Sequence, residues 1–121
     1  MDSSKVQTVT IASGAAVSSS IDLASIVPRG IAVQTPAAWT AADIGLEVSV
    51  DNSTFIKLYD EFGARVKVTN VATGAAGVYI LPASAWAISV YAYARFASLN
   101  TSTGADANQG AARTLKAILL V

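Results

Sequence analysis

The chain has 121 residues, which is the usual size of one domain, and its eight basic and eight acidic residues give a formal net charge of zero. Only 13% of the residues are charged, against roughly 25% in a typical soluble domain, so we expect part of the surface to be covered by a partner. The zero net charge disfavours binding to nucleic acid or to an anionic membrane. The absence of cysteine and histidine excludes disulfides, thiolate nucleophiles, imidazole bases and the usual zinc and haem sites.

The first 25 residues differ in character from the rest of the chain. They contain two short alternating segments, 6–11 and 17–23, and a run of serines. We interpret residues 1–25 as either a strand pair or an arm that orders only on assembly, since serine-rich segments stay disordered at little cost. Residues 26–121 are expected to form a single folded domain.

The clearest predicted hairpin occupies residues 44–59. Apolar and polar residues alternate from Ile44 to Val50, a turn follows at 51–53, and residues 54–59 return. Asn52 suits this turn because asparagine tolerates a left-handed backbone.

Further strands are predicted at 66–69, 78–81, 87–96 and 112–121. About nine short strands without room for crossover helices predict an all-β fold, either an antiparallel β-sandwich, which we expect to be jelly-roll-like, or a barrel. The last strand ends on an apolar run, which predicts that it is a central strand or is buried by another subunit.

Five acidic residues fall near the predicted hairpin: Asp43, Glu47, Asp51, Asp60 and Glu61. Two such carboxylates at the right separation could hydrolyse a glycoside, and several could hold a structural cation. The alternative is that they cap turns and solvate strand ends, and we favour it because nothing nearby indicates a raised pKa. We therefore expect no catalytic residue, no metal and no cofactor.

The aromatic residues are more informative. Trp39 and Trp86 follow alanine-rich segments, whereas Tyr91, Tyr93 and Arg95 share the polar face of the 87–96 segment. Exposed aromatic and arginine side chains are typical of protein interfaces and of sugar-stacking platforms. The alternative for the two tryptophans is that they close the ends of the sandwich. These five residues are the candidate interface.

Part of the sequence resembles a group of small virion proteins of tailed bacteriophages. The resemblance rests on Pro36-Ala-Ala-Trp39-Thr40, on the alternating segment 44–51, and on Thr54-Phe55-Ile-Lys-Leu58-Tyr59-Asp60-Glu-Phe-Gly63. It continues weakly to the last residues and covers roughly residues 28–121. The turn departs from the Asp-Gly of that group, since Asn52 stands at the left-handed position.

The resemblance implies a β-sandwich in a virion and no reaction. We expect a capsid decoration (cement) protein, synthesised in the host cytoplasm, that binds the major capsid protein and forms a trimer or another cyclic homo-oligomer. The alternative is a neck, head-fibre or tail component that binds a glycan on the host surface.

Overall fold

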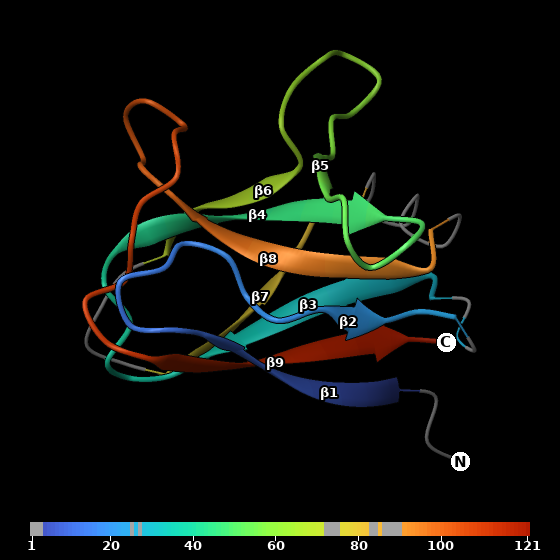
Figure 1. Cartoon of the computed structure of the whole chain (residues 1–121), viewed down its shortest axis with the longest axis horizontal. Coiled ribbons are helices and arrows are strands. Elements are labelled where there is room, and N and C mark those ends of the chain that lie inside the picture. Colours follow the sequence, from blue (N-terminus) through green and yellow to red (C-terminus); the bar gives the residue numbers. More distant parts are fainter. Residues whose placement is uncertain (1–3, 25, 27, 72–75, 83–84, 86–90) are drawn as a thin grey trace.

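The computed structural model describes residues 4–24, 26, 28–71, 76–82, 85 and 91–121, which form two antiparallel sheets (Figure 1). No helix in this part of the chain is long and apolar enough to cross a membrane. The strands are β1 (Ser4–Ile11), β2 (Ile21–Asp22), β3 (Gly30–Thr35), β4 (Ala42–Ser49), β5 (Ile56–Lys57), β6 (Lys67–Val71), β7 (Gly77–Ile80), β8 (Tyr93–Leu99) and β9 (Arg113–Leu120).

One sheet has the strand order β1-β9-β3-β7, and we call it the β9 sheet. The other has the order β2-β8-β4-β5 with β6 also paired to β4, and we call it the β4 sheet. Strands β5 and β6 share one edge of β4, since β6 pairs with residues from Ala42 to Gly45 and β5 pairs with Glu47 and Val48. Strands β4, β5 and β6 follow one another within the β4 sheet. Every other pair of consecutive described strands lies in different sheets.

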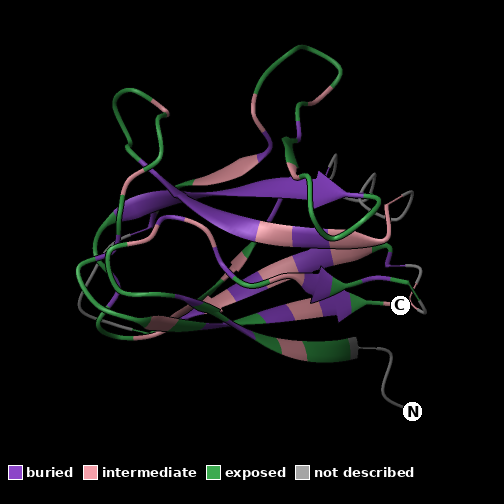
Figure 2. Ribbon diagram, viewed as in Figure 1, coloured by how far each residue is buried: buried purple, intermediate pink, exposed green. Residues whose placement is uncertain are grey.

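The core lies between the sheets; alternate residues of β3 and β9 point into it, whereas β4 in the other sheet is buried at every residue (Figure 2). Strand β9 buries Leu115, Ala117 and Leu119, and β3 buries Ile31 and Val33. Each large aliphatic side chain buried in this way stabilises the fold by about 1.5–3 kcal/mol. The alternate residues of the β9 sheet therefore face outward.

The predicted all-β fold and the hairpin at 44–59 are confirmed. Strand β4 pairs with β5 in an antiparallel register, and Asn52 in the connecting turn has φ +59°. Strand β9 lies between β1 and β3, which matches the central-strand alternative for the last segment.

Two predicted boundaries are wrong. The segment 17–23 forms only the two-residue strand β2, because Val17 and Ser18 make isolated bridges to opposite sheets, to Ala97 and Ile11, where the chain crosses over. The segment predicted at 87–96 ends too early, because β8 runs from Tyr93 to Leu99; Tyr91 and Ala92 precede the strand, and residues 86–90 lie outside the described part.

The expected boundary after residue 25 does not coincide with a break in the sheets. Strand β1 pairs with β9 along its whole length, and β2 pairs with β8. The described residues between 4 and 24 thus contribute one strand to each sheet. Gln7 ties the two strands together, because its side chain donates to the carbonyl of Asp22 and accepts from the N–H of the same residue.

Candidate interaction surfaces

The strand register aligns outward-facing apolar side chains across the β9 sheet. Val6 lies opposite Ile118, Ile118 opposite Ala32, and Ala32 opposite Ile80. Leu120 faces outward two residues beyond Ile118 and is 45% exposed, while Ile80 is 83% exposed. We call these five residues the apolar row. Such a contiguous exposed apolar strip is typical of an interaction site.

The apolar row is hollowed over β3. Gly30 and Ala32 carry little or no side chain there, whereas Ile80 on β7 and Ile118 and Leu120 on β9 stand on either side. The resulting hollow has a volume of about 260 Å³ and is lined almost entirely by apolar atoms. A single large apolar side chain is the natural occupant of such a depression.

The surroundings of the apolar row are basic. Strands β1, β3, β7 and β9 contain Lys5, Arg113 and Lys116 and no acidic residue. Lys116 is exposed and lies two residues from Ile118, on the same face of β9. Arg29, immediately before β3, is also exposed, and its guanidinium donates to the main-chain oxygen of Val121 at 3.1 Å.

A second surface is the hairpin of residues 58–66, which we call the Phe62 hairpin. It projects from the β4 sheet, on the side of the sandwich opposite the β9 sheet (Figure 1). Phe62 at its tip is 87% exposed. The carboxylate of Asp60 accepts hydrogen bonds from the N–H groups of Phe62 at 2.8 Å and Ala64 at 2.9 Å, and Gly63 takes the left-handed backbone that the turn needs.

The candidate residue Arg95 is engaged within the chain. Its guanidinium lies 2.7 Å from the carboxylate of Glu47, directly opposite on β4, and 4.2 Å from the centre of the Phe55 ring. Arg65 approaches the other oxygen of Glu47 at 3.6 Å. Arg95 retains 27% side-chain exposure, so its main contacts are internal.

The two candidate tyrosines are half-buried. Tyr93 lies opposite Ser49 in the β4–β8 register. Tyr91 lines a small hollow of about 160 Å³ together with Val50 and Ile56, both of which are exposed. The structure therefore places Tyr91 beside exposed apolar side chains.

Trp39 is completely buried in the core and presents no ring surface to a partner. Its indole nitrogen has no hydrogen-bond partner among the described residues. The prediction that Trp39 is an interface residue is therefore wrong, because its large indole fills space between the sheets. Trp86 lies outside the described residues.

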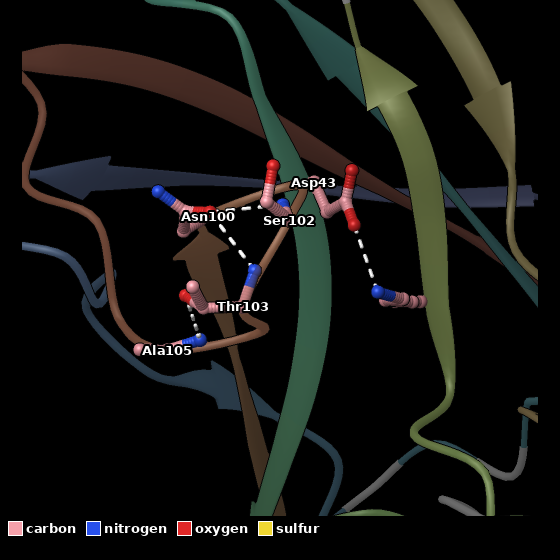
Figure 3. Close-up of polar contacts among 6 residues, drawn as sticks. Asp43, Asn100, Ser102, Thr103 and Ala105 are labelled. Carbon is pink, nitrogen blue, oxygen red and sulfur yellow. Dashed lines mark hydrogen bonds and ion pairs between the residues drawn. The ribbon is translucent and has the colours of Figure 1, made fainter.

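The acidic residues of the hairpin region occupy structural positions. Asp43 pairs with Lys67 at 2.8 Å (Figure 3). It lies beside the loop that follows β8, in which the Asn100 side chain accepts hydrogen bonds from the N–H groups of Ser102 and Thr103. Glu47 belongs to the ion pairs with Arg95 and Arg65 described above. The described residues contain no group of three or more His, Cys, Asp or Glu side chains placed to hold a metal ion.

Asp51 accepts hydrogen bonds from the N–H groups of Thr54 and Ser53 and from the hydroxyl of Ser49. These bonds, led by the one from Thr54, hold the pKa of the Asp51 carboxyl below its ordinary value. The charge of Asp51 thus stabilises the turn between β4 and β5.

Comparison of the chain with protein-family models, with curated proteins and with solved structures found no match. Reasoning from sequence did not single out Phe62 or the apolar row. The available signal for Phe62 was its position between Glu61 and Gly63, in a segment whose Asp60 and Gly63 favour a turn, because a large apolar side chain in a turn has no core to enter.

Proposed function

We propose that this chain is a non-enzymatic structural protein of a phage virion, a decoration (cement) protein that binds the outer face of the head lattice. The observation that carries the proposal is the presence of two exposed apolar surfaces, the apolar row and the Phe62 hairpin, on opposite sides of one sandwich. A protein that links neighbouring subunits needs several contact surfaces held at fixed distances, because several contacts of modest affinity then give a high overall avidity.

The strand connections support the same proposal. The chain alternates between sheets with the orders β1-β9-β3-β7 and β2-β8-β4-β5, and we propose that this is a jelly-roll-like arrangement. Double-sheet jelly rolls are frequent in viral capsid proteins and in lectins. The proposed partners are the major capsid protein and further copies of this chain, in a trimer or another cyclic oligomer, and the proposed location is the virion.

The test is binding of the purified chain to heads that lack it, taken from the phage that encodes it and measured by co-sedimentation and by the temperature at which the heads break. We expect saturable binding and a raised disruption temperature. The variant Ile80→Asp, in the apolar row, and the control Thr10→Asp, at the polar end of the same sheet face, separate specific from general effects. Unchanged heads and no co-sedimentation of the native chain would overturn the proposal.

A second candidate is a neck, head-fibre or tail component that binds a glycan. It is favoured by Tyr91, whose ring borders a small hollow beside Val50 and Ile56, since aromatic rings at a surface depression can stack on sugars. Glycan-array binding that is lost in Tyr91→Ala would support this function. An array without any binding would remove it.

A further inference from the structure

We propose that the apolar row of one copy receives the Phe62 hairpin of a second copy, so that the protein associates head to tail. The inference rests on the proposed function, because it names one partner of the two surfaces that make the chain multivalent. It is argued from the shape, the rigidity and the charge of the two surfaces.

The shapes match as a knob and a hole. Phe62 is the most exposed large apolar side chain of the described residues and stands alone at the tip of its hairpin. The hollow in the apolar row has a floor of Gly30 and Ala32, and its walls are the side chains of Ile80 and Leu120. An aromatic anchor that fills a pocket is the usual centre of a protein interface.

The hairpin is ordered before any partner arrives. Asp60 holds the tip through its bonds to the N–H groups of Phe62 and Ala64, and the backbone N–H of Asp60 donates to the carbonyl of Ala64 at 2.8 Å. At the base of the hairpin, the N–H of Val66 donates to the carbonyl of Leu58. Binding therefore immobilises few additional bonds, which lowers its entropic cost.

The charges favour a contact between a hairpin and a row over a contact between two rows or between two hairpins. The tip carries Asp60 and Glu61, whereas the apolar row is bordered by Lys116 and Arg29. Two apolar rows face to face would bring Lys116 of each copy together, and two hairpins would bring Glu61 of each copy together. Only the contact between hairpin and row joins opposite charges, and like charges across an interface are unfavourable.

The arrangement of the surfaces determines the kind of assembly. Because they lie on opposite sides of the sandwich (Figure 1), each contact leaves one free hairpin and one free row. A contact of this kind is heterologous, and it closes into a ring or continues as a chain according to the rotation between neighbours. On a head lattice, the same contact would tie adjacent copies to one another.

The experiment uses sedimentation velocity on the full chain over a concentration series, without heads. We expect concentration-dependent association of the native chain. Phe62→Ala should weaken it by about 10- to 100-fold, whereas the control Val50→Ala, which removes another exposed apolar side chain, should leave it unchanged. Thermal melts identify any variant that fails to fold.

The decisive step mixes two variants that are each expected to be monomeric. Phe62→Ala keeps an intact row, and Ile80→Asp keeps an intact hairpin, so an equimolar mixture should form a one-to-one dimer and nothing larger. The charge reversals Glu61→Lys and Lys116→Glu should each weaken association. Mixing them should restore it through both contacts, because each hairpin then meets a row of opposite charge, so assemblies larger than a dimer should form again.

The outcomes are distinguishable from those of the head-binding test. A native chain that stays monomeric at every concentration, or a mixture that stays monomeric while the native chain associates, would overturn the head-to-tail contact, whatever the heads do. Association and rescue in solution without binding to heads would support this contact while the decoration function fails.

Discussion

Replacing Gln109 is expected to destabilise the fold far more than its place in a long loop suggests. Its side chain is 1% exposed and lies between the loop that follows β3 and the end of β8. The amide nitrogen donates to the carbonyl of Thr40 at 3.1 Å and to the hydroxyl of Ser98 at 2.9 Å, and the amide oxygen accepts from the N–H of Thr40 at 2.9 Å and from Arg113 at 3.2 Å. Both ends of the amide are thus occupied.

The magnitude follows from these bonds. Each net hydrogen bond contributes about 1 kcal/mol, and a partner left buried and unpaired costs more. Gln109→Ala removes three bonds to Thr40 and Ser98, while Arg113 retains its bond to the hydroxyl of Thr40. Because water can enter the space that the side chain leaves, we expect a loss of about 2–3 kcal/mol, and at ~3–5 °C per kcal/mol for a domain of this size the melting temperature should fall by about 6–15 °C.

The assay is urea unfolding followed by circular dichroism, with native-state hydrogen exchange as the local measurement. The N–H of Thr40 should lose its protection in Gln109→Ala, because its acceptor is gone. The neighbouring variant Asn108→Ala, at an exposed position, should stay within about 0.5 kcal/mol of the native chain. If Gln109→Ala also stays within that range, the amide makes no net contribution and the reasoning is refuted.

Three further changes test the β4 sheet. Glu47→Ala leaves the guanidinium of Arg95 without its carboxylate, and because Arg95 is partly exposed we expect a loss of about 2–3 kcal/mol in urea unfolding. Gly45→Ala places a Cβ 2.8 Å from a buried leucine side chain of β8, which should cost about 1–3 kcal/mol by thermal melting. Asp51→Ala removes a carboxylate whose pKa is lowered, chiefly by the N–H of Thr54, so its stabilisation is present above the ordinary value of 3.8 and is lost as the pH falls through the lower folded value. The difference in unfolding free energy between Asp51→Ala and the native chain should therefore shrink in acid; a difference that grows would contradict this.

Local patterns predicted the elements in which apolar and polar residues alternate, including β4, whose polar side chains Asp43, Glu47 and Ser49 are buried by ion pairs and hydrogen bonds. The hairpin at 44–59 was found because alternation and an asparagine turn are properties of neighbouring residues. The end of β8 was missed because Ala97, Ser98 and Leu99 are all fully buried and are small or apolar, so no clear alternation marks this part of the strand.

The candidate interface was harder to predict, because burial and pairing depend on residues distant in sequence. Arg95 looked available as a charged residue on a polar strand face, but the register places Glu47 opposite it. The apolar row is invisible in any single segment, since Val6, Ala32, Ile80 and Ile118 come from four strands. Only the register between those strands brings them together.

The buried charges of β4 also determine how the Phe62 hairpin is held. Arg65 lies at the base of the hairpin, where it bridges to Tyr59, and its guanidinium packs over Gly45 toward Glu47. A Cβ at position 45 would lie 3.2 Å from a nitrogen of this guanidinium, which would have to move by a few tenths of an ångström. Buried ion pairs add little to stability compared with apolar packing, but they fix the orientation of what they join. The ion pair between Arg65 and Glu47 therefore joins the base of the hairpin that carries Phe62 to the central strand of the β4 sheet.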